Sequence, residues 1–512
     1  KPPPVAQEAP PLAAAEAPCG LLAPCRELER QAGTAPAPGA ARPNVLLLLA
    51  DQHRGDWLGF RGDVPGVVTP NIDRLAREGV AFANAWSPAP LCAPARACLA
   101  TAQPYDRQPV RSNDQDLPEG TPTIYQDLRA AGYAVMSCGK LDLLKRSKDW
   151  GRDGLHNSSG RSRFEALGFT AGRDSAGKED GALAARKGRQ HPYAAFLQER
   201  GLLDAYLADM MRRGHDFQPF RGLQSSWFER YTRTEPTPLP DEAYHDNWVG
   251  QQGLGLLAAA PREGPWFLQV NFVGPHEPLD VTRRMRERWA SAPEPPGPAD
   301  GADFGAERHR EMRRNYAAMI HNIDAWVGRY LEFLEMTGQR GKTLVVYASD
   351  HGEQLGDHGK WSKVDPELGS LHVPLVMAGA GVRPGGPVAT PVDLVDLART
   401  VLDWAGVAPP RQLGGASLRD ALEGRELPWS HRTAGIGSWR AITDGRFKYV
   451  HNWRRDQGLS GAQLLQAAWD PDPGAPAALF HTASDPAERA DLLASEPGLA
   501  AEYRRKLLEE LP

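Results

Sequence analysis

The feature that most limits what this chain can fold into is the run at 45–50 (VLLLLA), where six consecutive residues are apolar and Asp51 follows directly. A strand with one face in water alternates apolar and polar residues. An unbroken apolar run is instead typical of a parallel strand that is covered on both faces. The run therefore predicts an α/β fold with helices on both sides of a sheet.

Further apolar runs, separated by helical patterns, extend this prediction over most of the chain. The predicted strands are 133–138, 266–272, 343–349 and 374–377. The predicted helices include 70–78, 121–131 and a long amphipathic helix at about 316–334, whose apolar residues recur every three or four positions. We predict one large, mostly parallel mixed sheet sandwiched by helices.

The sequence divides into three parts. Residues 1–41 contain 12 Ala and 9 Pro, a composition that cannot form a packed amphipathic face, so we predict an N-terminal arm. Residues 42–425 form the predicted main domain, with a charged, glycine-containing insertion at about 143–250. Residues 426–512, with short alternating runs and a helical end at 497–508, predict a small C-terminal α+β subdomain.

Charge and hydropathy exclude two classes of protein. Lys and Arg number 59 against 64 Asp and Glu, a net charge of −5, so no basic excess favours nucleic acid or an anionic membrane. The longest aliphatic run is far shorter than the roughly 20 residues needed to span a bilayer. We expect neither nucleic-acid binding nor a membrane span.

The cysteine content bears on the compartment. Five cysteines are too few for a disulfide-based fold in a chain of 512 residues. Cys19 and Cys25 are the pair that could form a disulfide in an exported protein. The chain starts at Lys1 with no recognisable leader, which is compatible with a signal peptide that has been removed. Localisation stays open, with a periplasmic or secreted protein favoured over a cytoplasmic one.

Two acidic residues each follow a predicted strand directly: Asp51 after 45–50, and Asp350 after 343–349. In open α/β sheets, ligands bind beyond the carboxyl ends of the strands. Carboxylates delivered by two such ends can converge on one cation. The alternative is that each Asp only caps the turn after its strand.

Cys92 lies in the segment Cys92-Ala-Pro-Ala-Arg96, which is followed by small residues that favour a helix. Pro94 suits the first turn of a helix, which puts Cys92 at the positive end of the helix dipole and Arg96 one turn further on. Such a position stabilises an anion or an oxygen nucleophile. The alternative for a cysteine in front of a helix is an ordinary buried thiol.

Together these residues resemble the type I sulfatases of the alkaline-phosphatase superfamily, whose hallmark Cys-x-Pro-x-Arg segment carries a cysteine that is oxidised to formylglycine. The resemblance runs from Pro43 to about Leu508 and is carried by an ordered series of segments: Arg42-Pro-Asn-Val-Leu46, Thr69-Pro-Asn-Ile-Asp-Arg-Leu75, Gly139-Lys140, Gly274-Pro-His276, Ser349-Asp-His-Gly-Glu353, Lys363 and Asp485-Pro-Ala-Glu488. It implies an alkaline-phosphatase-like fold. It also implies hydrolysis of a sulfate ester, of a carbohydrate or an aryl alcohol, to the alcohol and inorganic sulfate.

The resemblance implies a metal site as well. It assigns Asp51, Asp350 and His351 as ligands of one divalent cation, completed by the formylglycine formed from Cys92, with Gln52 where many relatives have a second Asp. The pairing of Asp-Gln with Asp-His is similar to choline sulfatases and phosphonate monoester hydrolases. Because Gln52 offers only a neutral oxygen, this ligand set suits Ca²⁺ first and Mn²⁺ second.

The same resemblance assigns four residues to the sulfate. Arg96 would hold the formylglycine hydrate and the sulfate, Lys140 and Lys363 would bind sulfate oxygens, and His276 would protonate the leaving alcohol. A sulfate ester is anionic, so attack by an oxygen needs cations around its peripheral oxygens and an acid at the bridging oxygen. One hydroxyl of the hydrate attacks sulfur, and the other then loses its proton so that sulfate is expelled. For Lys140 and Lys363 the alternative is solvated surface charge.

At Asp142 the chain departs from the family pattern, which reads Gly-Lys-Trp-His where this sequence has Gly139-Lys-Leu-Asp142. An ionised carboxylate there can replace the histidine in accepting the hydroxyl proton during sulfate release. The alternative is that Asp142 turns away to cap the segment before Lys145. Members similar to glucuronate-2-sulfatase share Gly-Lys-Leu-Asp, which makes a sulfated uronic acid one substrate hypothesis.

Two other functions compete with that of a sulfatase. The same site could hydrolyse a phosphonate monoester or a phosphodiester, although the phosphonate hydrolases compared lack Lys140. The other alternative is a catalytically silent binding protein, against which the intact nucleophile and ligand set argue. The basic clusters 145–148 and 283–288 could form a rim for an anionic polysaccharide or be solvated helix faces. The expected partners are the sulfate ester and a maturation enzyme that generates formylglycine; the oligomeric state is not predicted.

Overall fold

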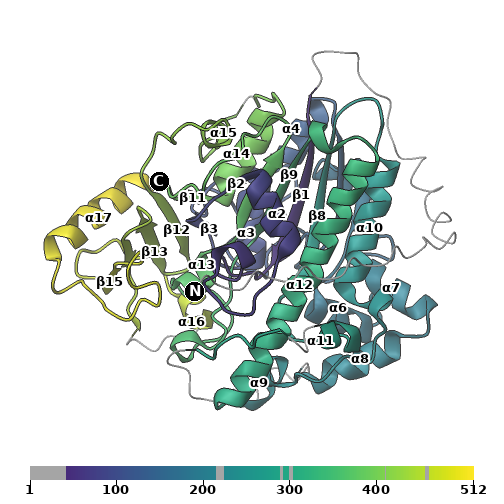
Figure 1. The fold of residues 1–512 in the computed structure, drawn as a ribbon, viewed down its shortest axis with the longest axis horizontal. Helices are drawn as coiled ribbons and strands as arrows, with labels where there is room; N and C mark the ends of the chain where they lie inside the picture. Colours follow the sequence, from purple (N-terminus) through teal and green to yellow (C-terminus); the bar gives the residue numbers. More distant parts are fainter. Residues whose placement is uncertain are drawn as a thin grey trace, which may run out of the picture.

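The computed structural model describes residues 42–158, 160–214, 224–288, 292–298, 304–409, 411–455 and 461–511. The predicted N-terminal arm, with Cys19 and Cys25, lies outside these residues. The described chain forms a large α/β unit and a smaller C-terminal unit (Figure 1).

A seven-stranded sheet forms the centre of the larger unit. Its strand order is β2 (Gly79–Ala81), β10 (Leu375–Gly379), β9 (Thr343–Ser349), β1 (Asn44–Asp51), β8 (Trp266–Pro275), β4 (Ala134–Gly139) and β7 (Ala171–Asp174). The strands from β9 to β7 run parallel to one another, whereas β10 is antiparallel to β9 and β2 is antiparallel to β10. The predicted, mostly parallel mixed sheet is confirmed.

The position of β1 explains its unbroken apolar run. Val45, Leu47 and Leu49 pack into the hydrophobic core on one face of the sheet, and the residues between them, with Ala50, pack into the core on the other face. Since side chains alternate between the faces of a strand, two cores require an apolar residue at every position. β1 accordingly lies between β8 and β9, and all its residues are buried.

Helices cover both faces of this sheet (Figure 1). The core on one face includes residues of α3 (Cys92–Thr101), α4 (Ile124–Ala130) and α14 (Leu394–Trp404). The core on the other face includes residues of α2 (Pro70–Glu78), α10 (His245–Ala259) and α12 (Ala306–Met336). α2 has the predicted bounds, and α12 extends beyond the predicted 316–334 at both ends.

A polar contact fixes the start of α2. Pro70 occupies its first turn, where a missing N–H costs no hydrogen bond. The carboxylate of Asp324 on α12 accepts hydrogen bonds from the backbone N–H groups of Asn71 (3.0 Å) and Ile72 (2.8 Å). Asp324 thus satisfies N–H groups that a helix start leaves unpaired, and it ties α2 to α12.

The stretch 143–250, predicted as an insertion, contains the edge strand β7 and a series of short helices. Its further elements are β5 (Asn157–Ser158), β6 (Arg161–Ser162), α5 (Arg163–Ala166), α6 (Lys178–Arg186), α7 (Pro192–Glu199), α8 (Leu203–Arg212) and α9 (Gln224–Thr232), before α10 begins. Since β7 pairs with β4, this stretch contributes to the main sheet. Its boundaries as an insertion stay a prediction.

The C-terminal unit is a four-stranded antiparallel sheet with a helix packed on it. The strands are β12 (Arg432–Ile436), β13 (Trp439–Thr443), β14 (Lys448–His451) and β15 (Ala477–Phe480), in that spatial order. α17 (Pro497–Glu510) buries Tyr503 and Leu507 against Ile442 and Leu479 of this sheet. The remaining short elements are β3 (Ala85–Trp86), β11 (Val392–Asp393), α11 (Arg283–Arg288), α13 (Leu368–Leu371), α15 (Arg419–Leu422) and α16 (Gly461–Gln466).

Candidate active site

Four parallel strands carry predicted site residues at or just after their carboxyl ends, on one side of the sheet. Asp51 is the last residue of β1, Lys140 follows β4, His276 follows β8 and Asp350 follows β9. Neighbouring parallel strands end on the same side of a sheet, so these residues converge. Cys92 reaches the same place from the first turn of α3.

Four buried side chains form a group that could hold a metal ion: Asp51, Cys92, Asp350 and His351. One donor atom from each lies within 4.8 Å of the others. His351 Nε2 lies 3.8 Å from Asp51 Oδ1, 3.7 Å from Asp350 Oδ1 and 3.2 Å from Cys92 Sγ. Two carboxylates and an imidazole nitrogen around one point are a donor set that fits a divalent cation.

The other oxygens of the two carboxylates bind cations of the protein. Asp51 Oδ2 accepts hydrogen bonds from Arg96 Nη2 (3.0 Å) and from Lys140 Nζ, and Asp350 Oδ2 accepts one from Arg96 Nε (2.8 Å). Each carboxylate therefore turns Oδ2 toward Arg96 or Lys140 and Oδ1 toward His351. The Oδ1 atoms of the two carboxylates are therefore the ones that face the proposed metal position.

The buried cations also keep Asp51 ionised. Burial opposes its charged form, but Lys140, His276 and Arg96 hold the pKa of the Asp51 carboxyl well below its usual value. At Asp350 burial prevails, and it raises the pKa of that carboxyl despite the nearby Arg96 guanidinium. A bound divalent cation would favour the ionised form of both groups.

A backbone contact fixes the ring of His351. Its Nδ1 lies 2.9 Å from the carbonyl oxygen of Gly352, which can only accept, so Nδ1 carries the ring proton. In the neutral ring the lone pair of Nε2 then faces Asp51, Asp350 and Cys92. A metal-ligating histidine needs this tautomer.

Cys92 occupies an environment that stabilises an anion. It is the first residue of α3, at the positive end of the helix, as predicted. Burial and the Asp51 carboxylate oppose ionisation, yet Lys140, Lys363 and His351 hold the pKa of the Cys92 thiol well below its usual value. By contrast, burial raises the pKa of Cys138 to about 12. Both thiols are buried, but at Cys138 the Arg173 guanidinium does not offset burial, whereas at Cys92 three cationic groups do.

Gly139 explains how Lys140 reaches the site. Its φ of +88° lies in the left-handed region, and a Cβ at this position would come within 2.0 Å of the carbonyl oxygen of Asn271. Only glycine fits so close to β8. The next residue, Lys140, is 4% exposed and its Nζ lies 3.5 Å from Cys92 Sγ. Lys140 is therefore not the solvated surface charge of the alternative reading.

Gln52 lies between two carboxylates and a lysine. Its Nε2 donates to Glu277 Oε2 (2.7 Å) and to Glu353 Oε2, and its Oε1 accepts from Lys363 Nζ. Two carboxylates on one side of the amide identify that side as the NH₂ group. The amide oxygen, which the sequence predicts as a metal ligand, thus points toward Lys363.

His276 and Lys363 lie side by side. Lys363 Nζ is 2.7 Å from His276 Nε2, and His276 Nδ1 is directed at the backbone oxygen and the carboxylate of Glu277. Burial opposes the charge on Lys363, but Cys92 and Glu277 raise its pKa above the usual value. Lys363 is therefore a buried cation beside the candidate nucleophile.

Asp142 is buried beside two lysines. Its Oδ2 accepts a hydrogen bond from Lys145 Nζ (2.8 Å) and lies 3.5 Å from Lys140 Nζ. Burial opposes its charge, but Lys140 and Lys145 hold the pKa of the carboxyl well below its usual value. Oδ1 has no hydrogen-bond partner among the described residues. Oδ1 is therefore free to accept a hydrogen bond, although the low pKa weakens the carboxylate as a base, and its role stays a prediction.

Three buried residues of the site were not predicted. Glu353 entered only as the end of the segment Ser349–Glu353 and Glu277 was not singled out, although both are buried and hold Gln52. Lys145 was taken as part of a surface cluster, but it is 5% exposed and bridges Asp142 and Asp180. A signal was available for the glutamates, since each lies within two residues of a predicted site histidine, His276 or His351.

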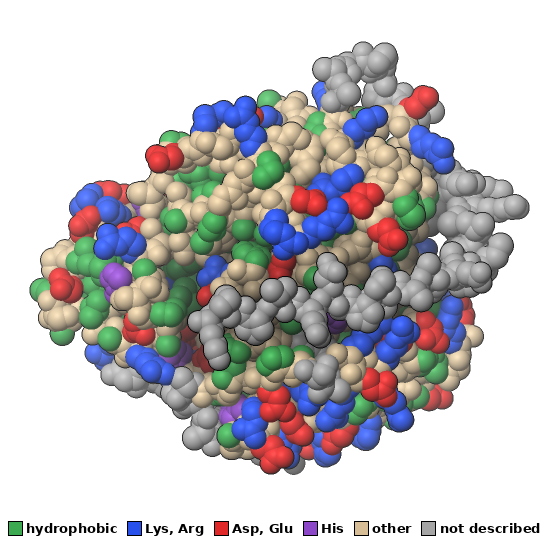
Figure 2. All heavy atoms as spheres, in the orientation of Figure 1, with side chains coloured by type: hydrophobic (Ala, Val, Ile, Leu, Met, Phe, Trp, Pro, Cys, Tyr) green, Lys and Arg blue, Asp and Glu red, His purple; other side chains and the backbone are tan. Residues whose placement is uncertain are grey.

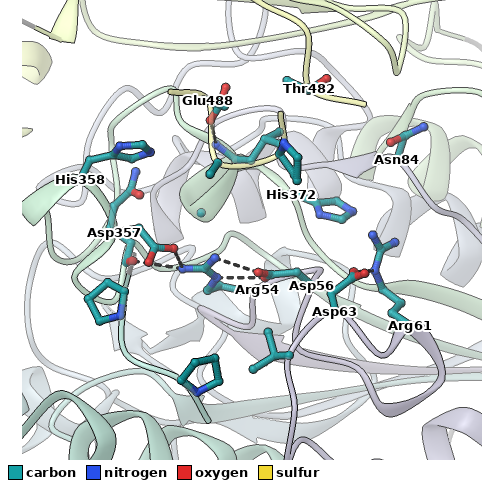
Figure 3. Close-up of a pocket in the computed structure, with 18 of the residues that line it drawn as sticks. Arg54, Asp56, Arg61, Asp63, Asn84, Asp357, His358, His372, Thr482 and Glu488 are labelled. Atoms are coloured by element: carbon teal, nitrogen blue, oxygen red, sulfur yellow. Dashed lines mark hydrogen bonds and ion pairs between the residues drawn. The ribbon is translucent and has the colours of Figure 1, made fainter. Parts of the chain in front are cut away.

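A cavity of about 710 Å³ lies outside this cluster, between the loop after β1 and the C-terminal unit (Figure 3). Arg54, one of its lining residues, forms ion pairs with Asp56 (2.8 Å) and Asp357 (2.6 Å). On the other side, residues such as Thr482 and Glu488 line it. None of the residues predicted for catalysis or metal binding is among its described lining residues.

The surface in Figure 2 shows acidic and basic side chains interspersed, without a broad area of one sign. This matches the small net charge of −5. Within the described ranges, no helix combines the length and the apolar character that a membrane crossing needs.

Known proteins resemble this chain over most of its length. An arylsulfatase of Clostridium perfringens is 26% identical over 411 residues, covering 76% of this chain and 80% of that protein. A choline-sulfatase of Rhizobium meliloti is 27% identical over 470 residues, covering 84% and 81%. Among solved structures, a phosphonate monoester hydrolase of Agrobacterium radiobacter superposes with a TM-score of 0.70 at 22% identity, over 91% of this chain and 95% of that one, which supports the fold. The family model described as Sulfatase matches residues 43–407, most of the chain, and the chain therefore belongs to the sulfatase family, whose members use a divalent metal and a formylglycine.

Proposed function

We propose that this protein hydrolyses the sulfate ester of an aryl alcohol or a carbohydrate to the alcohol and inorganic sulfate, with Cys92 as the precursor of the formylglycine. The observation that carries the proposal is the position of Cys92. Its Sγ lies 3.2 Å from His351 Nε2 and 3.5 Å from Lys140 Nζ, at the helix start where the donor group and the buried cations meet. Once converted, the residue supplies the hydroxyl that attacks sulfur.

The buried cations suit a sulfate group. Arg96, Lys140 and Lys363 can surround its peripheral oxygens, where charge accumulates as the bond to the alcohol breaks. Their charges are held in place by Asp51, Asp350 and Gln52, so they need little reorganisation when the substrate binds. His276 is the proposed acid that protonates the leaving oxygen.

We propose that Asp51, Asp350 and His351 hold the divalent cation, with Gln52 as a further oxygen ligand. The cation would act as a Lewis acid and polarise the oxygen that attacks. Ca²⁺ is favoured over Mn²⁺, because most of these donors are oxygens. In this structure the amide oxygen of Gln52 accepts a hydrogen bond from Lys363.

Asp142 is the proposed base for the second half of the reaction. It would accept a hydroxyl proton as sulfate leaves. The support is its burial beside Lys140, which keeps it ionised, and its free Oδ1. A sulfated uronic acid remains a substrate hypothesis that rests on the Gly-Lys-Leu-Asp segment.

A second candidate function is the hydrolysis of a phosphonate monoester or a phosphodiester at the same site. Gln52 favours it, since the Asp-Gln pair is similar to that of the phosphonate hydrolases. Lys140 argues against it, because its buried ammonium beside Cys92 is absent from that comparison group. Sulfate esters therefore remain the preferred substrates.

The test compares rates on an aryl sulfate, an aryl phosphate diester and an aryl phosphonate with one preparation whose Cys92 peptide is shown by mass spectrometry to carry the aldehyde or its hydrate. We expect the aryl sulfate to have the highest kcat/KM. Cys92→Ala is the control and should remove all three activities. A higher kcat/KM on the phosphonate would favour the second candidate, and full activity with an unmodified thiol would refute the assignment of Cys92.

The proposed partners are the sulfate ester and a maturation enzyme that forms the formylglycine. We also propose that the protein acts in the periplasm or outside the cell. The support is the possible pair Cys19 and Cys25, which lies outside the described residues. Fractionation of producing cells, with mass spectrometry of these two cysteines, would test that location.

A further inference from the structure

The carboxylate of Glu277 contacts two parts of the site at once. Glu277 is 3% exposed, and its Oε2 lies 2.7 Å from Gln52 Nε2 and 3.2 Å from His276 Nδ1. The amide of Gln52 in turn donates to Glu353. Glu277 is therefore held on one side by Gln52 and presents the same oxygen to His276.

These contacts determine which nitrogen of His276 faces the reaction. Nδ1 lies 2.6 Å from the backbone oxygen of Glu277 as well as near its carboxylate, and both are acceptors. Nδ1 must then carry a proton. The opposite nitrogen, Nε2, accepts a hydrogen bond from Lys363 Nζ at 2.7 Å, because an ammonium can only donate, and so it points into the group of cations around Cys92.

We propose that Glu277 is a positioning residue that orients His276 and places a carboxylate beside Nδ1, so that Nε2, once the sulfate group has drawn Lys363 away from it, can hold a proton and donate it to the leaving alcohol. This inference rests on the proposed function. As the S–O bond to the alcohol breaks, its electron pair stays on the alcohol oxygen, and the proton of Nε2 moves to that oxygen. The imidazolium becomes a neutral ring whose remaining proton stays on Nδ1, against Glu277. A carboxylate placed beside a catalytic histidine is a recurring device in acid–base catalysis.

If Glu277 acts through His276, its loss should affect each substrate according to its leaving group. A purely structural role would affect all substrates equally. Help from an acid matters most for a poor leaving group, because an acidic phenol departs without a proton. We expect Glu277→Gln to lower kcat/KM by about tenfold to a hundredfold for phenyl sulfate, a fraction of the range for a lost acid catalyst. For 4-nitrophenyl sulfate we expect a loss of less than about threefold, since that leaving group needs little proton transfer. The plot of log kcat/KM against leaving-group pKa should become steeper.

Glu353→Gln is the matched control. Glu353 is buried and contacts Gln52 as Glu277 does, but its other hydrogen bonds come from Tyr231, Leu355 and Ser362 rather than from His276. This variant should change activity by the same factor for all aryl sulfates. If Glu277→Gln also lowers all substrates equally, Glu277 only supports the structure and the proposal is overturned.

A second variant keeps the test decisive. If Glu277→Gln folds poorly, Glu277→Asp retains the charge but shortens its reach to Nδ1, and it should still steepen the plot. In both variants the backbone oxygen of residue 277 still accepts from Nδ1, so the tautomer of His276 should stay the same and any steepening reports the carboxylate. An unchanged plot in a folded variant would overturn the proposal.

His276→Asn separates a failure of this inference from a failure of the proposed function. If the wild type hydrolyses aryl sulfates but His276→Asn has the same leaving-group dependence, His276 is not the acid and the inference fails, while the sulfatase assignment stands. If the wild type with formylglycine hydrolyses no sulfate ester, the proposed function itself fails.

Discussion

The two sheets of this protein place polar residues in opposite ways. In the seven-stranded sheet, β1, β4, β8 and β9 run parallel, and each ends at or just before a predicted site residue. In the C-terminal sheet, β12 to β15 are antiparallel, so successive strands end on opposite sides. Its buried polar groups form separate pairs, such as Lys448 with Glu488 and Arg440 with Asp106.

The difference shows what topology contributes to chemistry. In a parallel sheet, the residues that follow the strands all lie at the same end of the sheet, beyond the carboxyl ends of the strands, whatever their distance in the sequence. Antiparallel strands distribute such residues over two edges, and the C-terminal sheet instead buries apolar residues against α17. Substitutions in the first sheet's edge should therefore change activity, and substitutions in the second sheet should change stability.

The largest effect is expected at the edge of the parallel sheet. Asp350→Ala removes a carboxylate from the donor group and should lower kcat by at least about a thousandfold, on the scale of lost electrostatic stabilisation. Excess Ca²⁺ or Mn²⁺ should not restore activity, and chelation should abolish the activity of the wild type. Circular dichroism must confirm folding, because Arg96 loses a buried partner. Wild-type activity in this variant would mean that the proposed metal site is wrong.

The opposite result is expected in the C-terminal sheet. Leu479 is fully buried on β15, and Leu479→Ala should lower the free energy of unfolding by about 2–5 kcal/mol. At temperatures where the variant is folded, kcat should stay within about twofold of the wild type, since an apolar truncation far from the chemistry removes no interaction with the transition state. Urea unfolding and initial rates measure the two quantities.

Met336→Ala is the control for Leu479→Ala. Met336 is 73% exposed, so its truncation should change stability by no more than about 0.5 kcal/mol. If folded Leu479→Ala loses kcat and Met336→Ala does not, the two sheets are functionally coupled. The C-terminal sheet would then contribute to activity as well as to stability.

A smaller effect is expected at Asp142. Asp142→Asn keeps the shape but removes the proposed base, so the steady-state rate should fall by about tenfold to a hundredfold, toward the lower end of general-base contributions. Alcohol should appear in a burst followed by a slow phase, because sulfate release becomes limiting. Stopped-flow measurement of the released phenol tests this. An unchanged steady-state rate would eliminate Asp142 as the base.

The smallest effect concerns pH and buried histidines away from the site. Burial lowers the pKa of His191 to about 4, and its Nδ1 accepts from the backbone N–H of Ala194 at the start of α7. A histidine whose folded pKa is depressed binds its proton more weakly in the folded state, so stability falls as pH drops from about 6.5 toward 4. At pH 5.5 His191 should contribute about 1.4 kcal/mol to this loss.

His191→Asn sharpens that prediction. Asparagine retains a side-chain cap for α7 but does not titrate. The free energy of unfolding should therefore depend less steeply on pH between 6.5 and 4 than in the wild type, as measured by urea unfolding at several pH values. An unchanged slope would mean that His191 is protonated in the folded protein.

The elements that the sequence predicts well are those with a strong local pattern. The continuous run of β9 and the Pro-initiated α2 have their predicted bounds, because two-sided burial and a proline at a helix start are visible in a few residues. β7 was missed because its sequence, AGRD, has no apolar run at the edge of the sheet. The antiparallel direction of β10 depends on long-range pairing and is invisible in its own residues.

The site residues also divide into those that a local pattern predicts and those whose position depends on distant contacts. The strand-end positions of Asp51 and Asp350, and the helix-start position of Cys92, could be predicted because each depends on adjacent residues. The contacts of Gln52 with Glu277 and Glu353 join residues 225 and 301 positions apart, so no local pattern announces them. What the sequence hides are the polar partners that hold the site residues in place.

The burial of helix α3 limits when Cys92 can be modified. All ten of its residues are buried, and Cys92 is 1% exposed, so an enzyme that must reach Cys92 has no access once α3 has docked between the sheet and α14. If Cys92 is the position of the formylglycine, its oxidation and folding compete in time. A chain that is modified first matures into a catalyst, whereas a chain that folds first is intact but inert. The fraction of active molecules would then be set during synthesis, by the speed of folding relative to that of the modifying enzyme.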